Sequence, residues 1–259
     1  MTTIFTDFRE GIARWPLWTA LAWDDIRNTY RRTAIGVAWY SRSFAFLVGA
    51  KLVIFGQINP ESFAQFAVYL AVGFLAWELL AAIVMEGCTV FTGAANWISG
   101  VKLPFSVYIF RSLTRISIQL TCRLIPVVTL FVLLQQDLTW GALSALPALG
   151  LIAFAGFFVQ LLLGTMCVRH RDIQHLVSNG IRVLFFLSPV VWTMDQLGRI
   201  GYWLWYNPFY HLIEIIRSPI LDGAFPAQSW LYVLVFTGLI APLGIWAFAA
   251  TRRQIPFWV

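Results

Sequence analysis

The chain has 259 residues, of which 59% are hydrophobic and 12% are charged, and its formal net charge is +6. Soluble domains carry about 25% charged residues, so this composition excludes an ordinary soluble domain and indicates a protein that crosses a membrane several times. The basic residues lie at the ends of apolar segments and not on one soluble face, which argues against nucleic-acid binding and indicates orientation in a bilayer.

Residues 1–33 precede the first apolar segment and include an amphipathic stretch that begins near Pro16. Its apolar side chains recur near helical spacing, at Trp18, Leu21, Ala22 and Ile26. Charged side chains occupy the other side, so we expect a helix that lies in the cytoplasmic membrane interface and does not cross the bilayer. The helix is either only a membrane anchor or a sliding gate whose arginines meet lipid or pyrophosphate groups, since guanidinium groups suit phosphate oxygens.

Six apolar segments follow, each near the roughly 20 residues that a helix needs to cross a bilayer. They cover about 34–56, 64–86, 112–134, 145–168, 176–195 and 230–250. We therefore expect an all-α integral membrane protein with a cytoplasmic N-terminus over 1–33 and a six-span transmembrane domain over 34–259. No small-residue cleavage site follows the first segment, so we interpret it as a retained span and not as a signal peptide.

Basic residues are distributed unevenly between the two sides of the predicted membrane domain. The N-terminus, the second and fourth connections and the C-terminal tail hold thirteen lysines and arginines, whereas the other three connections hold only Arg199 and Arg217. Because positively charged segments stay in the cytoplasm, both termini are predicted to be cytoplasmic. The connection between the fifth and sixth spans then lies on the outer face.

Two ionisable residues lie inside predicted spans at matched depth. Arg42 in the first span and Glu78 in the second each lie eight residues, or about 12 Å, from the cytoplasmic end of their span. Charges at this depth are usually paired or face a cavity, so the sequence predicts a buried ion pair between Arg42 and Glu78. A structural pair is favoured here over a substrate site.

The connection over 87–110 is long for a protein whose other connections are mostly short, and long loops are often functional. Glycines, Asn96 and Pro104 bracket a helix-sized piece within it. We interpret it as a coupling element that docks into a cytoplasmic partner. The alternative is a long turn without such a role.

The segment at 198–228 is too polar to span a bilayer and too aromatic for an ordinary solvated loop. Asn207 and Pro208 are typical of a helix start, with asparagine as N-cap and proline at the first helical position, and the helix is predicted to stop near Pro219. Two helices of roughly 8–12 residues would each reach only about 12–18 Å. The segment therefore predicts two short re-entrant helices on the outer face, with a plain interfacial aromatic belt as the alternative.

Several kinds of enzymatic chemistry have no signature in the chain. There is no P-loop, because the only lysines are Lys51, inside a span, and Lys102, in the sequence Gly-Val-Lys-Leu. His170 and His175 make a poor metal site, and the single adjacent acidic pair, Asp24 and Asp25, is interpreted as solvated. The three cysteines are scattered and indicate no disulfide framework. We therefore expect no catalytic residues, no metal and no cofactor in this chain.

A series of short motifs in a fixed order resembles the membrane (permease) subunit of ABC-type polysaccharide exporters, the group that handles O-antigen, capsule and teichoic acid. The resemblance covers essentially the whole chain. The most specific pieces are Arg27-x-x-Tyr30-Arg31-Arg32 with Gly36-x-x-Trp39, Arg171-Asp172, Ser188-Pro189, and Asn207-Pro208 with Glu214 and Arg217. Each piece is weak alone, and their order and spacing carry the resemblance.

This resemblance implies a homodimer in the bacterial inner membrane with two separate ABC ATPase subunits, which hold the ATP and magnesium. The substrate would be an undecaprenyl-diphosphate-linked polysaccharide, with O-antigen favoured over capsule or teichoic acid. Residues 16–32 would form the gate helix, and residues 88–104 the coupling helix. The implied residues are Arg27, Arg31 and Arg32 for the lipid head group, and Asn96, Trp97, Lys102 and Pro104 for ATPase coupling.

The resemblance also implies a pore between the first and fifth spans of the two copies, closed outside by the aromatic segment. The implied pore residues are Trp39, Tyr40, Phe44, Phe185, Phe186 and Trp192, and the implied outer lid consists of Tyr202, Trp203, Trp205, Tyr206, Phe209 and Tyr210. Sugar rings present C–H groups that can lie on the negative face of an aromatic ring, and weak contacts of this kind let a polymer pass without being trapped. Packing against lipid or other helices is the alternative for each aromatic residue.

Three other functions remain as alternatives at the level of sequence. An ABC permease for a small molecule would need a pocket and not a continuous aromatic lane. A membrane enzyme of glycolipid synthesis would turn over a lipid-linked sugar without a partner. An assembly scaffold that transports nothing would tolerate substitution of the pore tryptophans.

Overall fold

The regular structure in the described residues is entirely helical, which confirms the predicted all-α class. The computed structural model describes residues 4–55, 63–136, 140–192 and 205–259. The longer helices are α2 (Trp15–Tyr30), α3 (Trp39–Phe55), α4 (Phe63–Thr89), α6 (Phe105–Leu133), α7 (Ala145–Arg169), α8 (Asp172–Phe186), α10 (Pro208–Leu221) and α11 (Ala227–Thr251). The shorter elements are α1 (Ile4–Ala13), α5 (Ala95–Gly100), α12 (Ile255–Trp258), and the 3-10 turns η1 (Gly36–Ala38), η3 (Thr92–Ala94) and η4 (Trp140–Ser144).

Five helical segments in the described part of the chain are long and apolar enough to cross a membrane. They cover Gly36–Ile54, Phe63–Thr89, Phe105–Leu133, Trp140–Arg169 and Ala227–Thr251. The predicted span at 176–195 is not among them, because α8 has 15 residues, or about 22 Å, against a hydrocarbon core of about 30 Å. Pro189 disfavours helical backbone just beyond the end of α8. The predicted count of six is therefore not confirmed, and residues 193–204 lie outside the described range.

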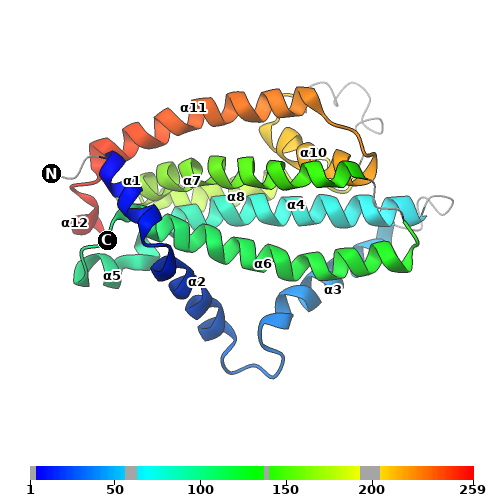
Figure 1. Cartoon of the computed structure of the whole chain (residues 1–259), viewed down its shortest axis with the longest axis horizontal. Coiled ribbons are helices and arrows are strands. Elements are labelled where there is room, and N and C mark those ends of the chain that lie inside the picture. The colour runs from blue at the N-terminus through cyan, green and yellow to red at the C-terminus, as the bar shows by residue number, and fades with distance from the viewer. Residues whose placement is uncertain (1–3, 56–62, 137–139, 193–204) are drawn as a thin grey trace.

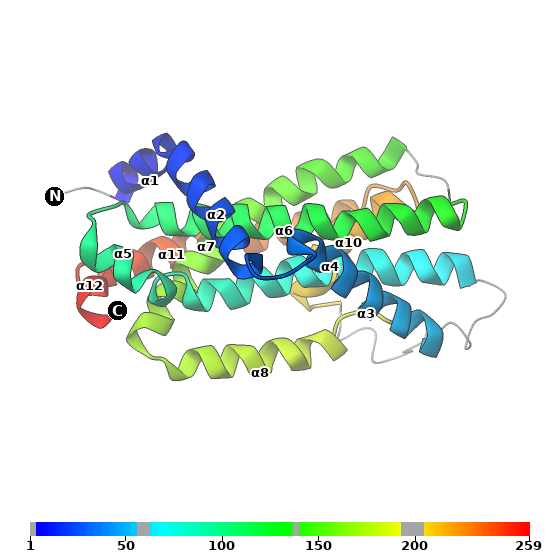
Figure 2. The same cartoon turned by 90° about the horizontal axis from the view of Figure 1, so that it is seen from below.

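Four of the long helices, α4, α6, α7 and α11, run along one another and form the body of the molecule (Figure 1). Both termini, α5 and α12 lie at one end of this body, which we call the termini end, while α10 lies toward the opposite end. Helix α4 is the most enclosed, and most of its residues from Ala67 to Ile83 are buried. Figure 2 shows α1 and α8 on opposite sides of the bundle.

The N-terminal region contains two helices where the sequence predicted one. Helix α2 is the predicted amphipathic helix, and it packs its fully buried Ala22 and Ile26 against α6. Helix α1 precedes it and is fixed to α6 by Asp7, whose carboxylate accepts hydrogen bonds from the backbone N–H groups of Phe105 (3.0 Å) and Ser106 (3.1 Å). These N–H groups belong to the first turn of α6, so Asp7 caps that helix from outside.

The connection predicted over 87–110 is shorter in the structure, because α4 continues to Thr89 and α6 begins at Phe105, seven residues before the predicted start of the third span at residue 112. The helix-sized piece within it is present as α5, at the termini end. Pro104 ends the connection as the N-cap residue of α6, where its missing N–H costs no intrahelical hydrogen bond.

Close packing between α7 and α11 depends on Gly244. A Cβ atom at this position would lie 2.8 Å from the backbone oxygen of Phe158, whereas one at Gly238 on the same helix would meet nothing within 4 Å. Small residues allow such close approach of membrane helices.

We expect Gly244→Ala to destabilise the protein by about 1–3 kcal/mol through overpacking, which would lower the midpoint of thermal unfolding of the purified protein. Gly238→Ala is the matched control, because it introduces the same methyl group into the same helix without a clash. Equal midpoints for the two variants would contradict the close packing described here.

Candidate functional site

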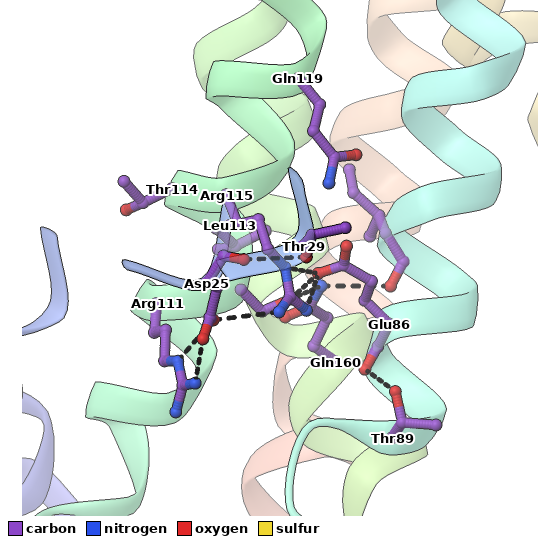
Figure 3. Close-up of polar contacts among 12 residues, drawn as sticks. Asp25, Thr29, Glu86, Thr89, Arg111, Leu113, Thr114, Arg115, Gln119 and Gln160 are labelled. Atoms are coloured by element: carbon purple, nitrogen blue, oxygen red, sulfur yellow. Dashed lines mark hydrogen bonds and ion pairs between the residues drawn. The ribbon is translucent and has the colours of Figure 1, made fainter. Parts of the chain in front are cut away.

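Four charged side chains from three helices meet at the termini end and form what we call the ionic cluster: Asp25 (α2), Glu86 (α4), Arg111 and Arg115 (both α6) (Figure 3). Arg111 binds Asp25 through two nitrogens, one of them Nε at 2.7 Å from Oδ2. Arg115 bridges the two acids, at 3.0 Å from Asp25 and 2.8 Å from Glu86. The cluster therefore ties α2 to the bundle through ion pairs.

Polar side chains extend the ionic cluster to α7. The hydroxyl of Ser112 donates to Glu86 at 2.7 Å and accepts from the amide of Gln160 at 3.0 Å. Gln160 is fully buried and also donates to the backbone oxygen of Ile83. Four helices thus share one hydrogen-bonded network, and its two acids balance its two arginines.

The ionic cluster was not predicted from the sequence. Asp25 was interpreted as solvated, and Arg111 and Arg115 were used only for topology, yet the side chain of Asp25 is only 18% exposed. The available signal was the spacing of the two arginines, since residues four apart share one face of a helix. That face points at α2 and α4.

A second polar cluster fixes α10 to α4 and to the residues after α8, and we call it the arginine anchor: Tyr69, Pro189, Glu214 and Arg217. Arg217 is 4% exposed, pairs with Glu214 at 2.7 Å and donates to the backbone oxygen of Pro189 at 2.5 Å. Its guanidinium group lies 4.2 Å from the ring centre of Tyr69. The hydroxyl of Tyr69 donates to the backbone oxygen of Trp192 at 3.0 Å.

Two of the motifs singled out in the sequence also meet at the start of α10. Asn207 is the N-cap as predicted, with its side-chain oxygen accepting from the N–H of Phe209 at 3.0 Å. Its amide nitrogen donates to the backbone oxygen of Leu187 (3.1 Å) and to the hydroxyl of Ser188 (3.2 Å). The Ser188-Pro189, Asn207-Pro208 and Glu214/Arg217 motifs, which are separate in sequence, therefore belong to one structural unit.

Helix α10 ends at Leu221, two residues beyond the predicted stop at Pro219. Asp222 is the C-cap residue and Gly223 follows with a φ of 64°. Glycine adopts this left-handed conformation readily, and it commonly terminates helices. The glycine rather than the proline therefore sets the end of α10.

His211 on α10 is hydrogen-bonded through both ring nitrogens to residues outside that helix. Its Nε2 lies 2.8 Å from the backbone oxygen of Trp205, which can only accept, so Nε2 carries the proton. Its Nδ1 then accepts from the hydroxyl of Ser229 at 3.0 Å, and the ring stacks on Tyr232. Burial lowers the pKa of His211, which agrees with a neutral ring that links α10 to α11.

The predicted ion pair between Arg42 and Glu78 does not form among the described residues. Glu78 instead pairs with Arg123 on α6, at 3.4 Å, and Arg42 is exposed. Matched depth in the membrane was not sufficient to identify the partner of Glu78, because depth does not determine which face of a helix a side chain occupies. Arg123 lay inside a predicted span and was not considered as a partner.

The six residues implied for a pore do not share one environment within a single chain. Trp39 and Phe186 are 41% and 74% exposed, on α3 and α8. Phe44, in contrast, is 5% exposed and belongs to the apolar core, so it is not available to a surface lane. Tyr40 is half-buried, and its hydroxyl accepts from Gln119 at 3.1 Å.

The other two implied pore residues lie near the arginine anchor. Phe185 packs against Phe74 and Trp77 of α4, with ring centres 5.5 and 5.4 Å apart. Trp192 is half-buried and contributes its backbone oxygen to Tyr69. The side chain of Phe185 is therefore partly occupied by contacts within the chain, whereas Trp192 is held through its backbone.

The six implied lid residues are only partly described, since Tyr202 and Trp203 lie outside the described range. Trp205 packs against Tyr210, and Phe209 packs against Trp77. Tyr206 is 72% exposed. The described part of the predicted hairpin thus contains helix α10, which has a mostly buried face, and two exposed aromatic rings outside that helix, Tyr206 and Phe225.

The residues implied for a head group and for a partner subunit are exposed, with one exception. Arg27, Arg31 and Arg32 lie exposed at the C-terminal end of α2 and just beyond it. Asn96 and Trp97 on α5 and Lys102 after it are also exposed, whereas Pro104 is buried. Both groups of exposed residues are open to contact from outside the chain.

Comparison with known proteins adds a family and several relatives. The family model described as ABC-2 type transporter matches residues 16–221. The O-antigen export system permease protein RfbA of Klebsiella pneumoniae is 24% identical over 220 residues, which cover 83% of this chain and 84% of that protein. A second K. pneumoniae protein of the same name is 22% identical over 220 residues with the same coverage. The RfbA protein of Myxococcus xanthus is 22% identical over 243 residues, covering 89% of this chain and 90% of its own.

Proposed function

The chain belongs to the ABC-2 type transporter family, and we propose that it is the transmembrane subunit of an ATP-driven exporter that moves a lipid-linked polysaccharide, with O-antigen as the first choice, across the bacterial inner membrane. The relatives with this name are permeases of O-antigen export systems and match most of the chain. ATP hydrolysis then belongs to separate ABC ATPase subunits, in agreement with the missing P-loop.

The observation that carries the proposal is the attachment of α2 to α6 and α4 through the ionic cluster. Helix α6 begins five residues after α5 ends, and α5 presents its exposed Asn96 and Trp97 at the termini end. A movement of α5 imposed by an ATPase would therefore pass along α6 to α2. In this mechanism α5 is the coupling helix and α2 is the gate, with the termini end in the cytoplasm.

Two copies of the chain would enclose the path of the polymer. Helices α3 and α8 each expose an aromatic side chain, Trp39 and Phe186, which a sugar ring can contact through its C–H face. With α3 and α8 facing a second copy, these rings would line the path. The opposite end of that path would be closed by α10, held in place by the arginine anchor.

The head group of the lipid carrier would be bound at the end of α2. Arg27, Arg31 and Arg32 are exposed and close together in sequence, and guanidinium groups bind phosphate oxygens in a bidentate manner. An undecaprenyl diphosphate would supply the phosphate oxygens. The diphosphate would then lie beside the gate while the sugar chain enters.

We expect charge reversal at these three positions to abolish most export. The variant Arg27→Glu/Arg31→Glu/Arg32→Glu would be produced with its cognate ATPase in a strain that lacks its own O-antigen permease. Surface polysaccharide should fall by more than about tenfold, since each basic residue near an anionic group contributes about 1 kcal/mol. The amount of ATPase that co-purifies should not change.

Arg14→Glu is the matched control, because Arg14 is also an exposed arginine of the N-terminal region. Normal export by the triple variant would refute the head-group assignment. Export of a small molecule that short oligosaccharides do not inhibit would favour a small-molecule permease. Turnover of a lipid-linked sugar by the chain alone would favour an enzyme.

A further inference from the structure

An apolar cavity of about 460 Å³ lies between α1 and the bundle at the termini end. Its floor is formed by side chains from α7 and α11 that are no more than 6% exposed: Phe157, Phe158, Leu161 and Phe248. Its rim is formed by Phe5, Ile12 and Phe154, which are 87%, 53% and 54% exposed. The volume falls within the range of sites that hold small ligands.

With α7 and α11 spanning the bilayer as proposed, the cavity extends from the membrane surface into the hydrocarbon region. Ile245 on its wall lies six residues, or about 9 Å, before the end of α11, and Phe154 lies fifteen residues, or about 22 Å, before the end of α7. Arg9 and Asp7 line it on α1. The cavity is therefore charged where α1 covers it and apolar along the spanning helices.

The two charged residues of the cavity differ in what they already bind. Both oxygens of the Asp7 carboxylate accept hydrogen bonds from the first turn of α6, so Asp7 is committed to the fold. Arg9 is exposed, and its side chain makes no hydrogen bond or ion pair with the residues that the structure describes. One uncommitted positive charge thus lies beside a long apolar cavity.

We propose that this cavity is a binding site for a membrane phospholipid, with an acyl chain among the phenylalanine rings and the phosphate group on Arg9. Charge and depth match such a molecule, whose anionic group lies at the surface and whose chain runs inward. A second copy of the chain is a poorer occupant, because α1 and α8 lie on opposite sides of the bundle (Figure 2). The exclusion of a second copy rests on the proposed function, in which the dimer forms through α3 and α8.

The test uses the complete transporter with its ATPase, reconstituted in lipid nanodiscs that contain phosphatidylglycerol with a photoreactive group in the acyl chain. We expect cross-links to concentrate on the α7 peptide that contains Phe154 and Phe157 and on α1. Ile12→Trp should reduce these cross-links severalfold by filling the rim, while Ala13→Trp, an exposed neighbour that does not line the cavity, should not. Even labelling of all lipid-facing helices, unchanged by Ile12→Trp, would overturn the site.

A second measurement addresses the charged part of the site. Arg9→Gln should weaken retention of phosphatidylglycerol relative to phosphatidylethanolamine by about fivefold, the factor that corresponds to about 1 kcal/mol per basic residue at an anionic membrane surface. Arg14→Gln is the control. No change with Arg9→Gln would overturn the role of Arg9, and displacement of phosphatidylglycerol by the polysaccharide carrier would show that the site belongs to the substrate. Neither readout requires export, so failure here is distinct from failure of the proposed function.

Discussion

Replacing Arg217 with leucine is expected to destabilise the protein by about 3–5 kcal/mol, the range found when one partner of a buried ion pair is removed. Arg217 is 4% exposed, and its guanidinium group contacts Glu214, the backbone oxygen of Pro189 and the ring of Tyr69. Leucine leaves the Glu214 carboxylate and the Pro189 oxygen without these partners. We expect a large fall in the yield of folded protein and in its thermal midpoint.

Two further variants distinguish the effect of losing the arginine anchor from the effect of losing a positive charge. Arg217→Lys keeps the charge but cannot reach both Glu214 and Pro189 in the same planar geometry, so it should recover only part of the stability. Arg182→Leu removes an exposed arginine from α8 and should leave the midpoint nearly unchanged. A thermal midpoint for Arg217→Leu equal to that of Arg182→Leu would rule out the arginine anchor.

The second large effect is expected for Arg115→Leu, which removes the residue that joins the two acids of the ionic cluster. Glu86 loses its ion-pair partner, while Asp25 keeps Arg111. We expect a loss of about 2–3 kcal/mol, less than for a fully buried pair, because the Arg115 side chain is 30% exposed. Export should fall as well, since the link between α2 and α4 is broken.

A double-mutant cycle with Glu86→Gln measures this link directly. If the two residues interact as described, Glu86→Gln/Arg115→Leu should be less destabilised than the sum of the single variants. Arg111→Leu serves as the comparison, because Asp25 then still binds Arg115. Additive effects of Glu86→Gln and Arg115→Leu would mean that the ion pair between Glu86 and Arg115 does not contribute to stability.

The elements that sequence predicted well are those with a strong local signal. Asn207 and Pro208 begin α10 because capping and a proline at the first helical position are local effects. The apolar face of α2 was visible from the spacing of Ala22 and Ile26. The C-terminal end of the predicted fifth span was placed too far along the chain. Hydropathy counts the apolar residues beyond Pro189 and ignores that a proline disfavours helix before it, whereas α8 ends at Phe186.

The polar contacts were less predictable, since they depend on which helices become neighbours. Glu78 was recognised as needing a partner, but the partner is Arg123 on α6, which packs against α4, and not Arg42 on the preceding span. Asp25 looked solvated because the arginines that pair with it lie 86 and 90 residues away in the sequence, on α6. The meeting of Ser188 with Asn207 was likewise invisible, although both belonged to motifs that the sequence analysis had singled out.

The cap that Asp7 places on α6 has a consequence for how force travels through the N-terminal region. Helices α1 and α2 are separated only by Arg14, so this short unit is fastened to α6 at two points, through Asp7 and through Asp25. A pair of helices attached to one helix at two points cannot rotate freely about either attachment. Any tilt of the first turns of α6 should therefore move α1 and α2 together.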